Sequence, residues 1–190
     1  MATTLFLVRH GEVENPDGIL YGRLPGFGLS EVGRRQLEET AQILGRRAPI
    51  DELHASPMQR AQESADILAA KLGVAITTDE RLLETDIAGY QGGSFDALPR
   101  PYITEEPEHE GIECARSMRQ RLLAWAQEVS SGDDGRRIAA VSHRDPLVVA
   151  LLHWTNRGLT DLPGFDLPQG CIYEVVLDGG PRPAVMRLEG

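Results

Sequence analysis

An apolar run that ends in a cation and an imidazole is the feature that most constrains how this chain folds. Residues 5–8 are all apolar, and Arg9, His10 and Gly11 follow them directly. Such a run predicts a strand buried on both faces of a parallel sheet. At the strand end, where open α/β sheets bind ligands, Arg9 offers forked donors suited to phosphate oxygens, and a neutral His10 can attack phosphorus. Gly11 leaves the backbone room to approach a ligand.

A second cation is predicted at the start of a helix. Ser56 is a good helix N-cap and Pro57 suits the first helical position, so we expect Arg60 in the first turn. Free backbone N–H groups at a helix N-terminus already favour an anion there. Arg60 is therefore a candidate for binding the same ligand as Arg9.

A second imidazole follows another apolar run. Residues 138–142 are mainly apolar and lead directly to His143. Asp145 is predicted to cap a helix whose first residue is Pro146. We therefore expect His143 at a strand end beside a helix N-terminus, in a position comparable to that of the first imidazole.

Carboxyl groups lie between these segments along the chain. The stretch 81–92 is rich in turn-forming residues and carries Glu84 and Asp86 just after a short apolar stretch. A carboxylic acid beside a phosphate site can give a proton to a departing oxygen. The stretch therefore supplies a candidate proton donor.

Taken together, these segments resemble the histidine phosphatase superfamily, which is also described as phosphoglycerate-mutase-like. The likeness covers nearly the whole chain, and five motifs in a suitable order are a specific signal. They are residues 9–12 with Asn15, residues 29–33 at the start of a helix, and residues 56–61, 83–92 and 141–143.

The resemblance implies a role for each central residue. In that family the first His is the nucleophile, two Arg and the second His form the phosphate pocket, and a Glu donates a proton to the leaving group. The corresponding residues here are His10, Glu84 and His143 as catalytic groups, with Arg9, Arg60, Asn15 and Gly11 expected at the phosphate.

Two positions depart from the family pattern. Arg144 follows the second His where the family usually has a small residue, and residues 90–92 read Tyr-Gln-Gly in place of the common Trp-Glu-Gly. Neither departure removes a catalytic group. Arg144 either extends the anion site to a second acidic group of the substrate or points to solvent and pairs with Asp145. The adjacent carboxylate favours the second interpretation.

The segment 92–111 is predicted to be an irregular lid over the substrate. Its prolines break any helix, and a loop this long in a compact domain is usually functional or mobile. His109 lies in this segment and is a candidate substrate contact, although a lone loop histidine is more often solvated. Tyr21 and Arg23 follow the first motif and, with Arg144, complete the candidates for the mouth of the site.

Strand and helix patterns alternate along the chain. This alternation implies an α/β fold with a mainly parallel sheet covered on both faces, and the resemblance sharpens it to a three-layer α/β/α sandwich. A length of 190 residues fits a single domain, residues 1–190. The expected strands are 3–8, 53–55, 74–78, 137–142, 171–177 and 184–188, and the expected helices are 30–47, 57–72, 113–129 and 146–154.

The composition limits the partners. A formal net charge of −10 argues against nucleic acid, because phosphate backbones need a basic surface. The chain shows no charged-then-apolar leader and no apolar run of about 18 residues, so we expect no membrane span and a cytoplasmic location. Cys114 and Cys171 lack metal-type spacing and are expected to remain reduced thiols there.

We therefore expect a metal-independent phosphomonoester hydrolase that needs no cofactor and acts on a small-molecule phosphate ester through a phosphohistidine. A phosphomutase would use the same residues, although the short chain resembles phosphatases more. A metal-dependent hydrolase built on His10, His143, Glu84 and an aspartate is disfavoured, since no His-Glu-x-x-His or comparable ligand spacing appears. The remaining alternative is a non-catalytic phosphate-binding protein. The sequence identifies neither the substrate nor the oligomeric state.

Overall fold

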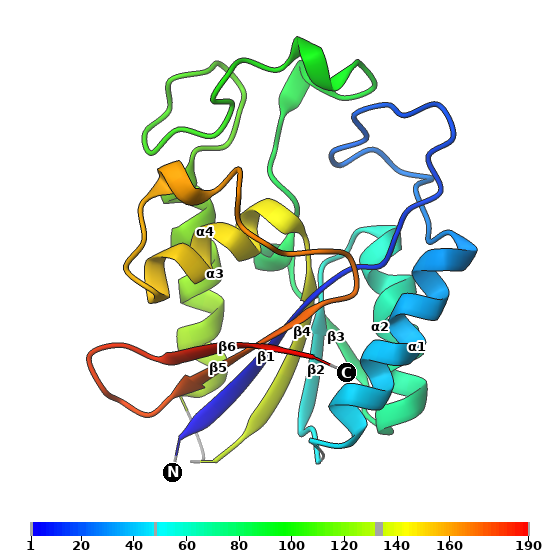
Figure 1. The fold of residues 1–190 in the computed structure, drawn as a ribbon, viewed down its shortest axis with the longest axis vertical. Helices are drawn as coiled ribbons and strands as arrows, with labels where there is room; N and C mark the ends of the chain where they lie inside the picture. The colour runs from blue at the N-terminus through cyan, green and yellow to red at the C-terminus, as the bar shows by residue number, and fades with distance from the viewer. Residues whose placement is uncertain (1, 48, 132–134, 190) are drawn as a thin grey trace.

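One mixed sheet runs through the computed structural model, which describes residues 2–47, 49–131 and 135–189 (Figure 1). Its strands are β1 (Thr3–Arg9), β2 (Glu52–Ala55), β3 (Ile76–Thr78), β4 (Arg137–Ser142), β5 (Ile172–Leu177) and β6 (Ala184–Leu188). In the described residues they pair in the order β3-β2-β4-β1-β5-β6. The first four strands in this order are mutually parallel, while β5 is antiparallel to both β1 and β6. The expected mainly parallel sheet is confirmed.

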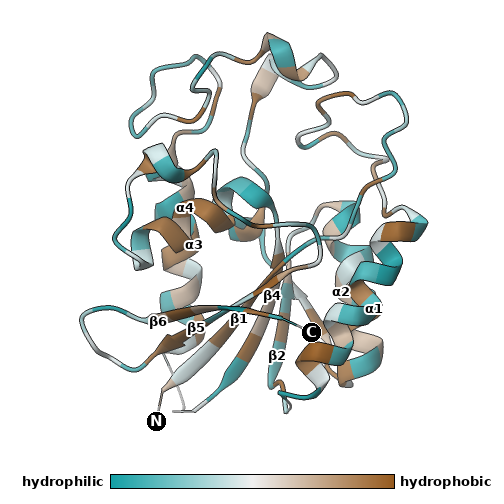
Figure 2. Cartoon of the chain, viewed as in Figure 1, coloured by the Kyte–Doolittle hydropathy of each residue, from teal (hydrophilic) through white to brown (hydrophobic). Residues whose placement is uncertain are grey.

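Helices cover both faces of this sheet, as the three-layer prediction requires (Figure 1). On one face α1 (Glu31–Gly45) and α2 (Gln59–Leu72) pack side by side, and on the other α3 (Ala115–Ser130) and α4 (Arg144–Trp154) do so. Alternate residues of β1 enter the two cores: Leu5 and Leu7 pack on the α3–α4 side, and Phe6 and Val8 on the α1–α2 side. This alternation explains why residues 5–8 of the strand are all apolar. Figure 2 shows the apolar colouring concentrated in the strands and in α4.

Local signals define the ends of α1 and α2. Ser30 caps α1, because its hydroxyl oxygen accepts a hydrogen bond from the amide of Gly33 at 3.0 Å. Gly73 ends α2 in the left-handed conformation, with a φ of 73°. Both helix ends agree closely with the sequence expectations.

Two predicted helix caps are wrong. The helix after Ser56 begins at Gln59, two residues later than predicted, because the Ser56 side chain pairs with His143. The helix after β4 begins earlier than predicted, at Arg144, and Asp145 lies in its first turn instead of capping it. Arg60 nevertheless lies in the first turn of α2, as expected.

The segment 92–111 crosses the sheet end at which β1 and β4 finish, in the upper part of Figure 1. Its only regular element is a 3₁₀ turn at Phe95–Ala97, which agrees with the irregular structure expected from its prolines. Among the described residues, no helix combines the length and the apolar character needed to cross a lipid bilayer.

Candidate active site

The register of β1 and β4 brings two histidines together. Arg9 lies opposite Ser142 in the parallel pair, so the residues that follow them, His10 and His143, leave the sheet side by side. The His10 amide donates a hydrogen bond to the Ser142 carbonyl at 3.0 Å. The two imidazole rings lie 5.0 Å apart between centroids. Two segments distant in sequence therefore form one centre at the sheet edge.

His10 presents a neutral imidazole in a defined orientation. Its side chain is 1% exposed, and Nδ1 lies 2.7 Å from the carbonyl oxygen of Gly11. Because a carbonyl only accepts, Nδ1 carries the hydrogen and Nε2 keeps its lone pair. Burial, followed by the charge of Arg60, lowers the pKa of His10 well below its ordinary value. The available nitrogen of His10 is therefore Nε2, in the unprotonated state that a nucleophile needs.

Arg9 and Arg60 supply unsatisfied donors to the same centre. Arg9 uses Nη1 to donate to the Leu167 carbonyl at 2.6 Å, and Arg60 uses Nη2 to donate to the Gly22 carbonyl at 2.8 Å. In the described part of the chain, the buried atoms Nε of Arg9 and Nε and Nη1 of Arg60 have no hydrogen-bond partner. Buried donors left in this way indicate a polar ligand, here an anion.

Arg60 is held rigidly in this position. The residue is fully buried, and its guanidinium lies over the ring of Tyr21, 4.8 Å from the ring centroid. That ring stacks in turn on Phe27 at 5.1 Å. Tyr21 thus supports Arg60, a candidate phosphate-binding group, in addition to lining the mouth of the site.

His143 is fixed by a residue that the sequence analysis assigned to a helix cap. Its Nε2 lies 2.8 Å from the hydroxyl of Ser56, and the residue is fully buried. Burial, followed by Arg60, lowers the pKa of His143 well below its ordinary value. The protein surroundings therefore favour a neutral His143.

Glu84 is the carboxyl group that reaches the histidines. Its Oε2 lies 3.8 Å from Nδ1 of His143, and its Oε1 accepts a hydrogen bond from the Thr85 amide at 2.8 Å. Burial, and secondly the nearby carboxylate of Asp145, raises the pKa of Glu84 to about 7. Glu84 can therefore hold a proton near neutral pH, as a general acid must.

The backbone of Glu84 is anchored by Arg23. Arg23 donates from Nε to the Glu84 carbonyl at 2.7 Å and pairs through Nη2 with Glu113 at 3.1 Å. Arg121 binds the same Glu113 carboxylate and also donates to the Arg81 carbonyl. The structure thus places Arg23 behind Glu84, as a support for its loop.

A cavity of about 190 Å³ reaches this centre at Arg9 and Glu84. Several of the sequence candidates line it, together with Tyr102, which was not among them, and Asp145, which was expected only as a helix cap and as the partner of Arg144. No pattern around Tyr102 marks it, because it reaches the site only through the path of the irregular segment. The lining residues that matter for the chemistry are Arg9, Tyr21, Glu84, Tyr102, Arg144 and Asp145.

Arg144 at this mouth binds three protein groups. It pairs with Asp145 at 3.1 Å and donates to the carbonyls of Leu162 and Pro163 at 2.9 and 3.2 Å. Asp145 also accepts a hydrogen bond from the Tyr102 hydroxyl at 2.5 Å. The expected pairing of Arg144 with its neighbour is present, and the guanidinium also bridges to the segment after α4.

Three other candidates use their polar groups within their own surroundings. Asn15 donates to the carbonyl of Ile19 and accepts from its amide, which closes a short loop. The amide of Gly11 donates to the Ser64 hydroxyl at 3.2 Å. His109 approaches the carbonyl of Pro101 at 2.8 Å, within the irregular segment.

Gly11, which follows His10, packs closely against a second glycine, Gly33 of α1. A Cβ atom on Gly11 would lie 2.6 Å from the carbonyl oxygen of Gly33, and one on Gly33 would lie 2.1 Å from the carbonyl oxygen of Glu12. Helix α1 therefore packs directly against the backbone that follows His10. The space beside Gly11 is therefore filled by α1 and not by a ligand, contrary to the expectation from the sequence.

The centre also has a donor set that could hold a metal ion. His10, Glu84 and His143 offer ligand atoms within 4.8 Å of one another. The charge of Arg60 acts on all three groups, lowering the pKa of each. A fixed positive charge that close opposes a cation and favours an anion.

The comparisons with known proteins agree with this geometry. Residues 5–188 match the family model described as the histidine phosphatase superfamily, branch 1. The chain is 52% identical over 189 residues to the protein Rv0525 of Mycobacterium tuberculosis, covering 93% of this chain and 91% of that one. It is 28% identical over 183 residues to the 2,3-bisphosphoglycerate-dependent phosphoglycerate mutase of Thermoplasma acidophilum, covering 92% and 87%.

The fold is also shared with a solved structure. The mycobacterial glucosyl-3-phosphoglycerate phosphatase Rv2419c superposes with a TM-score of 0.82, covering 98% of each chain at 21% sequence identity. At this identity the likeness concerns the arrangement of the elements. The α/β sandwich found here is therefore the one used by a phosphatase of known structure.

Proposed function

Because the chain belongs to the histidine phosphatase superfamily, we propose that it hydrolyses a small phosphomonoester through a phosphohistidine at His10. The observation that carries this proposal is the convergence of an unprotonated Nε2 on His10 with the unpartnered, buried donors of Arg9 and Arg60. A nucleophile beside an anion pocket is what phosphoryl transfer to nitrogen requires. The net charge of −10 supports a small ester over a nucleic acid as the substrate.

In the first step Nε2 of His10 attacks phosphorus in line with the ester oxygen. The new P–N bond forms as the P–O ester bond breaks, and the electron pair of that bond leaves on the ester oxygen. Glu84, protonated near pH 7, gives its proton to this oxygen, so a neutral alcohol departs. Arg9 and Arg60 bind the equatorial oxygens throughout, without a metal ion.

In the second step a water molecule attacks the phosphorus of the phosphohistidine. Glu84 is now a carboxylate and takes the water proton, while the P–N bond breaks and returns its electron pair to Nε2. Inorganic phosphate leaves and His10 is neutral again. His143 completes the phosphate pocket opposite Ser56, and the negative charge of a bound phosphoryl group raises its pKa against the lowering caused by burial.

The test is hydrolysis of a chromogenic aryl phosphate by the purified protein, with and without a chelator. We expect activity that survives chelation and is inhibited by vanadate, which mimics the five-coordinate phosphoryl group. Activity that disappears with chelator and returns with zinc or magnesium would assign catalysis to a metal ion on His10, Glu84 and His143. Absence of activity would leave a phosphate-binding protein.

Trapping of the intermediate tests the nucleophile. Labelled phosphate is expected on the wild-type protein as an adduct that is labile in acid and stable in base. His10→Ala abolishes the adduct, whereas His153→Ala, which changes an exposed histidine, retains it. A base-labile adduct would indicate an aspartyl phosphate instead. Transfer of the label to a second hydroxyl of the substrate, instead of to water, would identify a mutase.

A further inference from the structure

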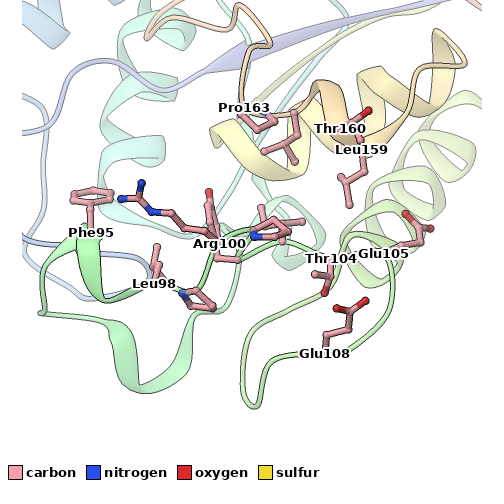
Figure 3. Close-up of a pocket in the computed structure, with 14 residues that line it drawn as sticks. Phe95, Leu98, Arg100, Thr104, Glu105, Glu108, Leu159, Thr160 and Pro163 are labelled. Atoms are coloured by element: carbon pink, nitrogen blue, oxygen red, sulfur yellow. The ribbon is translucent and has the colours of Figure 1, made fainter.

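A second and larger cavity lies beside the catalytic mouth. It has a volume of about 790 Å³, within the range of small-molecule sites in proteins. One wall comes from the irregular segment 95–108, and the other from residues 159–163, which follow α4 (Figure 3). Neither wall belongs to the sheet or to the phosphate-binding groups.

The walls of this cavity are mainly apolar. Leu98, Leu159, Leu162 and Pro163 line it, together with Phe95, whose side chain is 55% exposed. Phe95 thus extends the apolar lining of the cavity to its solvent-exposed rim. In Figure 3 the acidic residues of the lining, Glu105 and Glu108, lie at the end away from Phe95.

The cavity adjoins the catalytic mouth at three shared residues. Phe95, Leu98 and Tyr102 line both spaces. Tyr102 lines the larger cavity and reaches the catalytic side with its hydroxyl, which binds Asp145. A group attached to the oxygen that leaves phosphorus therefore has only these side chains between it and the larger cavity.

The charges around this passage argue against an acidic leaving group. Glu84 and Asp145 stand on the catalytic side, and Glu105 and Glu108 stand in the larger cavity. The cations of the two linings are Arg9 and Arg144 on the catalytic side and Arg100 in the larger cavity. Arg9 is assigned to the phosphoryl group, Arg144 binds Asp145 and two backbone carbonyls, and Arg100 pairs with Asp96 at 3.2 Å. A second carboxylate or phosphate on the substrate would thus compete with carboxylates for these cations, while an apolar body would meet apolar walls.

From this arrangement we infer that the substrate is a phosphomonoester whose leaving alcohol carries an uncharged apolar body, aromatic or long-chain, and that this body occupies the cavity between 95–108 and 159–163. The inference rests on the proposed phosphatase function and names its substrate class. Burial of an aromatic body of this size favours such esters over small polar ones by roughly 10- to 100-fold in kcat/KM.

The experiment compares 1-naphthyl phosphate and decyl phosphate with glycerol 2-phosphate and 3-phosphoglycerate. Decyl phosphate is matched with the two polar esters, which also release aliphatic alcohols, and 1-naphthyl phosphate is matched with O-phosphotyrosine, which also releases a phenol. Binding is measured separately by calorimetry on His10→Ala, which cannot turn the ester over. Thr160→Trp fills the cavity from its exposed rim, away from the catalytic groups. Thr77→Trp, an exposed position on the edge strand β3, is the matched control.

We expect wild type and Thr77→Trp to prefer the apolar esters by at least about tenfold, in both turnover and binding. Thr160→Trp should lose this preference while keeping its activity toward glycerol 2-phosphate, and Thr160→Glu provides a second variant that places a charge in the same space. Turnover without a preference for apolar esters, or a preference that is unchanged in both Thr160 variants, overturns the inferred substrate class while the proposed phosphatase function still stands. Preferential binding without turnover overturns the phosphatase and leaves the cavity as an apolar ligand site.

Discussion

Oxygen Oε2 of Glu84 lies 3.8 Å from Nδ1 of His143, and the surroundings drive both groups toward their neutral forms. Burial raises the pKa of the carboxyl and lowers that of the imidazole, so at neutral pH the proton of this pair belongs to Glu84. A proton held on a carboxylic acid can be given to a departing oxygen. The pair thus supports Glu84 as the acid and His143 as a phosphate ligand.

The first prediction concerns the leaving group. Glu84→Gln keeps the size of the side chain but removes the transferable proton, a contribution on the order of 10²–10⁴-fold in rate. An alkyl phosphate should suffer most of this loss in formation of the phosphoenzyme, because its oxygen departs poorly as an anion. An aryl phosphate with an acidic phenol should lose much less. Burst kinetics separates this step from dephosphorylation.

The pH dependence provides the control for this assignment. In wild type the rate of phosphoenzyme formation from an alkyl ester should fall about tenfold per pH unit above pH 7, as Glu84 loses its proton. The variant should lack this decline, while ionisation of the substrate affects both proteins equally. If Glu84→Gln slows phosphoenzyme formation by the same factor for alkyl and aryl esters, Glu84 is not the general acid, and Asp86 or Glu12 becomes the next candidate.

The second prediction follows from the same raised pKa and concerns stability. Glu84 has an ordinary pKa of 4.5 and a folded value of about 7, so the folded state binds more protons between these values. Wild type therefore loses stability as the pH rises through this window, by up to about 3 kcal/mol above pH 7. In urea unfolding, the free energy of unfolding of Glu84→Gln should rise relative to that of wild type between pH 5 and pH 8. A difference that is independent of pH would contradict burial as the cause.

The third prediction tests Arg23 as a positioning residue. Arg23→Met removes the donor to the Glu84 carbonyl and should slow phosphoenzyme formation about tenfold, more for alkyl than for aryl esters. Inhibition by vanadate should change little, since Arg9 and Arg60 remain. Arg34→Met, which removes an exposed ion pair with Glu63, is the control and should leave both readouts unchanged. Equal losses for the two ester types would reduce Arg23 to a purely structural role.

The fourth prediction compares two glycines of α1. Gly33→Ala places a methyl group against the Glu12 backbone, which has no room to yield, and should destabilise the protein by about 2–4 kcal/mol. Gly45→Ala, at the other end of the helix, meets no atom within 4 Å and should stabilise it by about 0.5–1 kcal/mol. Denaturant midpoints measure both. Similar effects at the two positions would show that helix propensity alone governs them.

Sequence patterns predicted the layers because apolar residues recur at the positions that the fold buries. Residues 5–8 contain no polar residue because their side chains enter the cores on both faces of the sheet. The patterns failed where a side chain has two local options of similar energy. Ser56 suits a helix cap and also a bond to an imidazole, and only the tertiary structure decides between them.

The parts of the site that the sequence did not reveal lie on segments without periodicity. Tyr102 lines the mouth only because the segment 92–111 folds back over the sheet end, and that path depends on contacts distant along the chain. The sequence showed Asp145 as a carboxylate between Arg144 and Pro146. It did not show that Asp145 lies near Glu84 or that the Tyr102 hydroxyl binds it, so the effect of Asp145 on the pKa of Glu84 could not be predicted.

The two histidines follow the two innermost strands of the sheet, since β1 is paired on both sides by β4 and β5, and β4 by β2 and β1. Strands paired on both sides open only when the whole domain opens, whereas a segment with few backbone bonds fluctuates at lower cost. The residues proposed for catalysis thus lie on the rigid central strands, and those proposed for substrate recognition lie on a segment with fewer backbone hydrogen bonds. We expect His10, the proposed nucleophile, to keep its place for as long as the protein stays folded, and the irregular segment, at the proposed site of the alcohol, to open at lower cost.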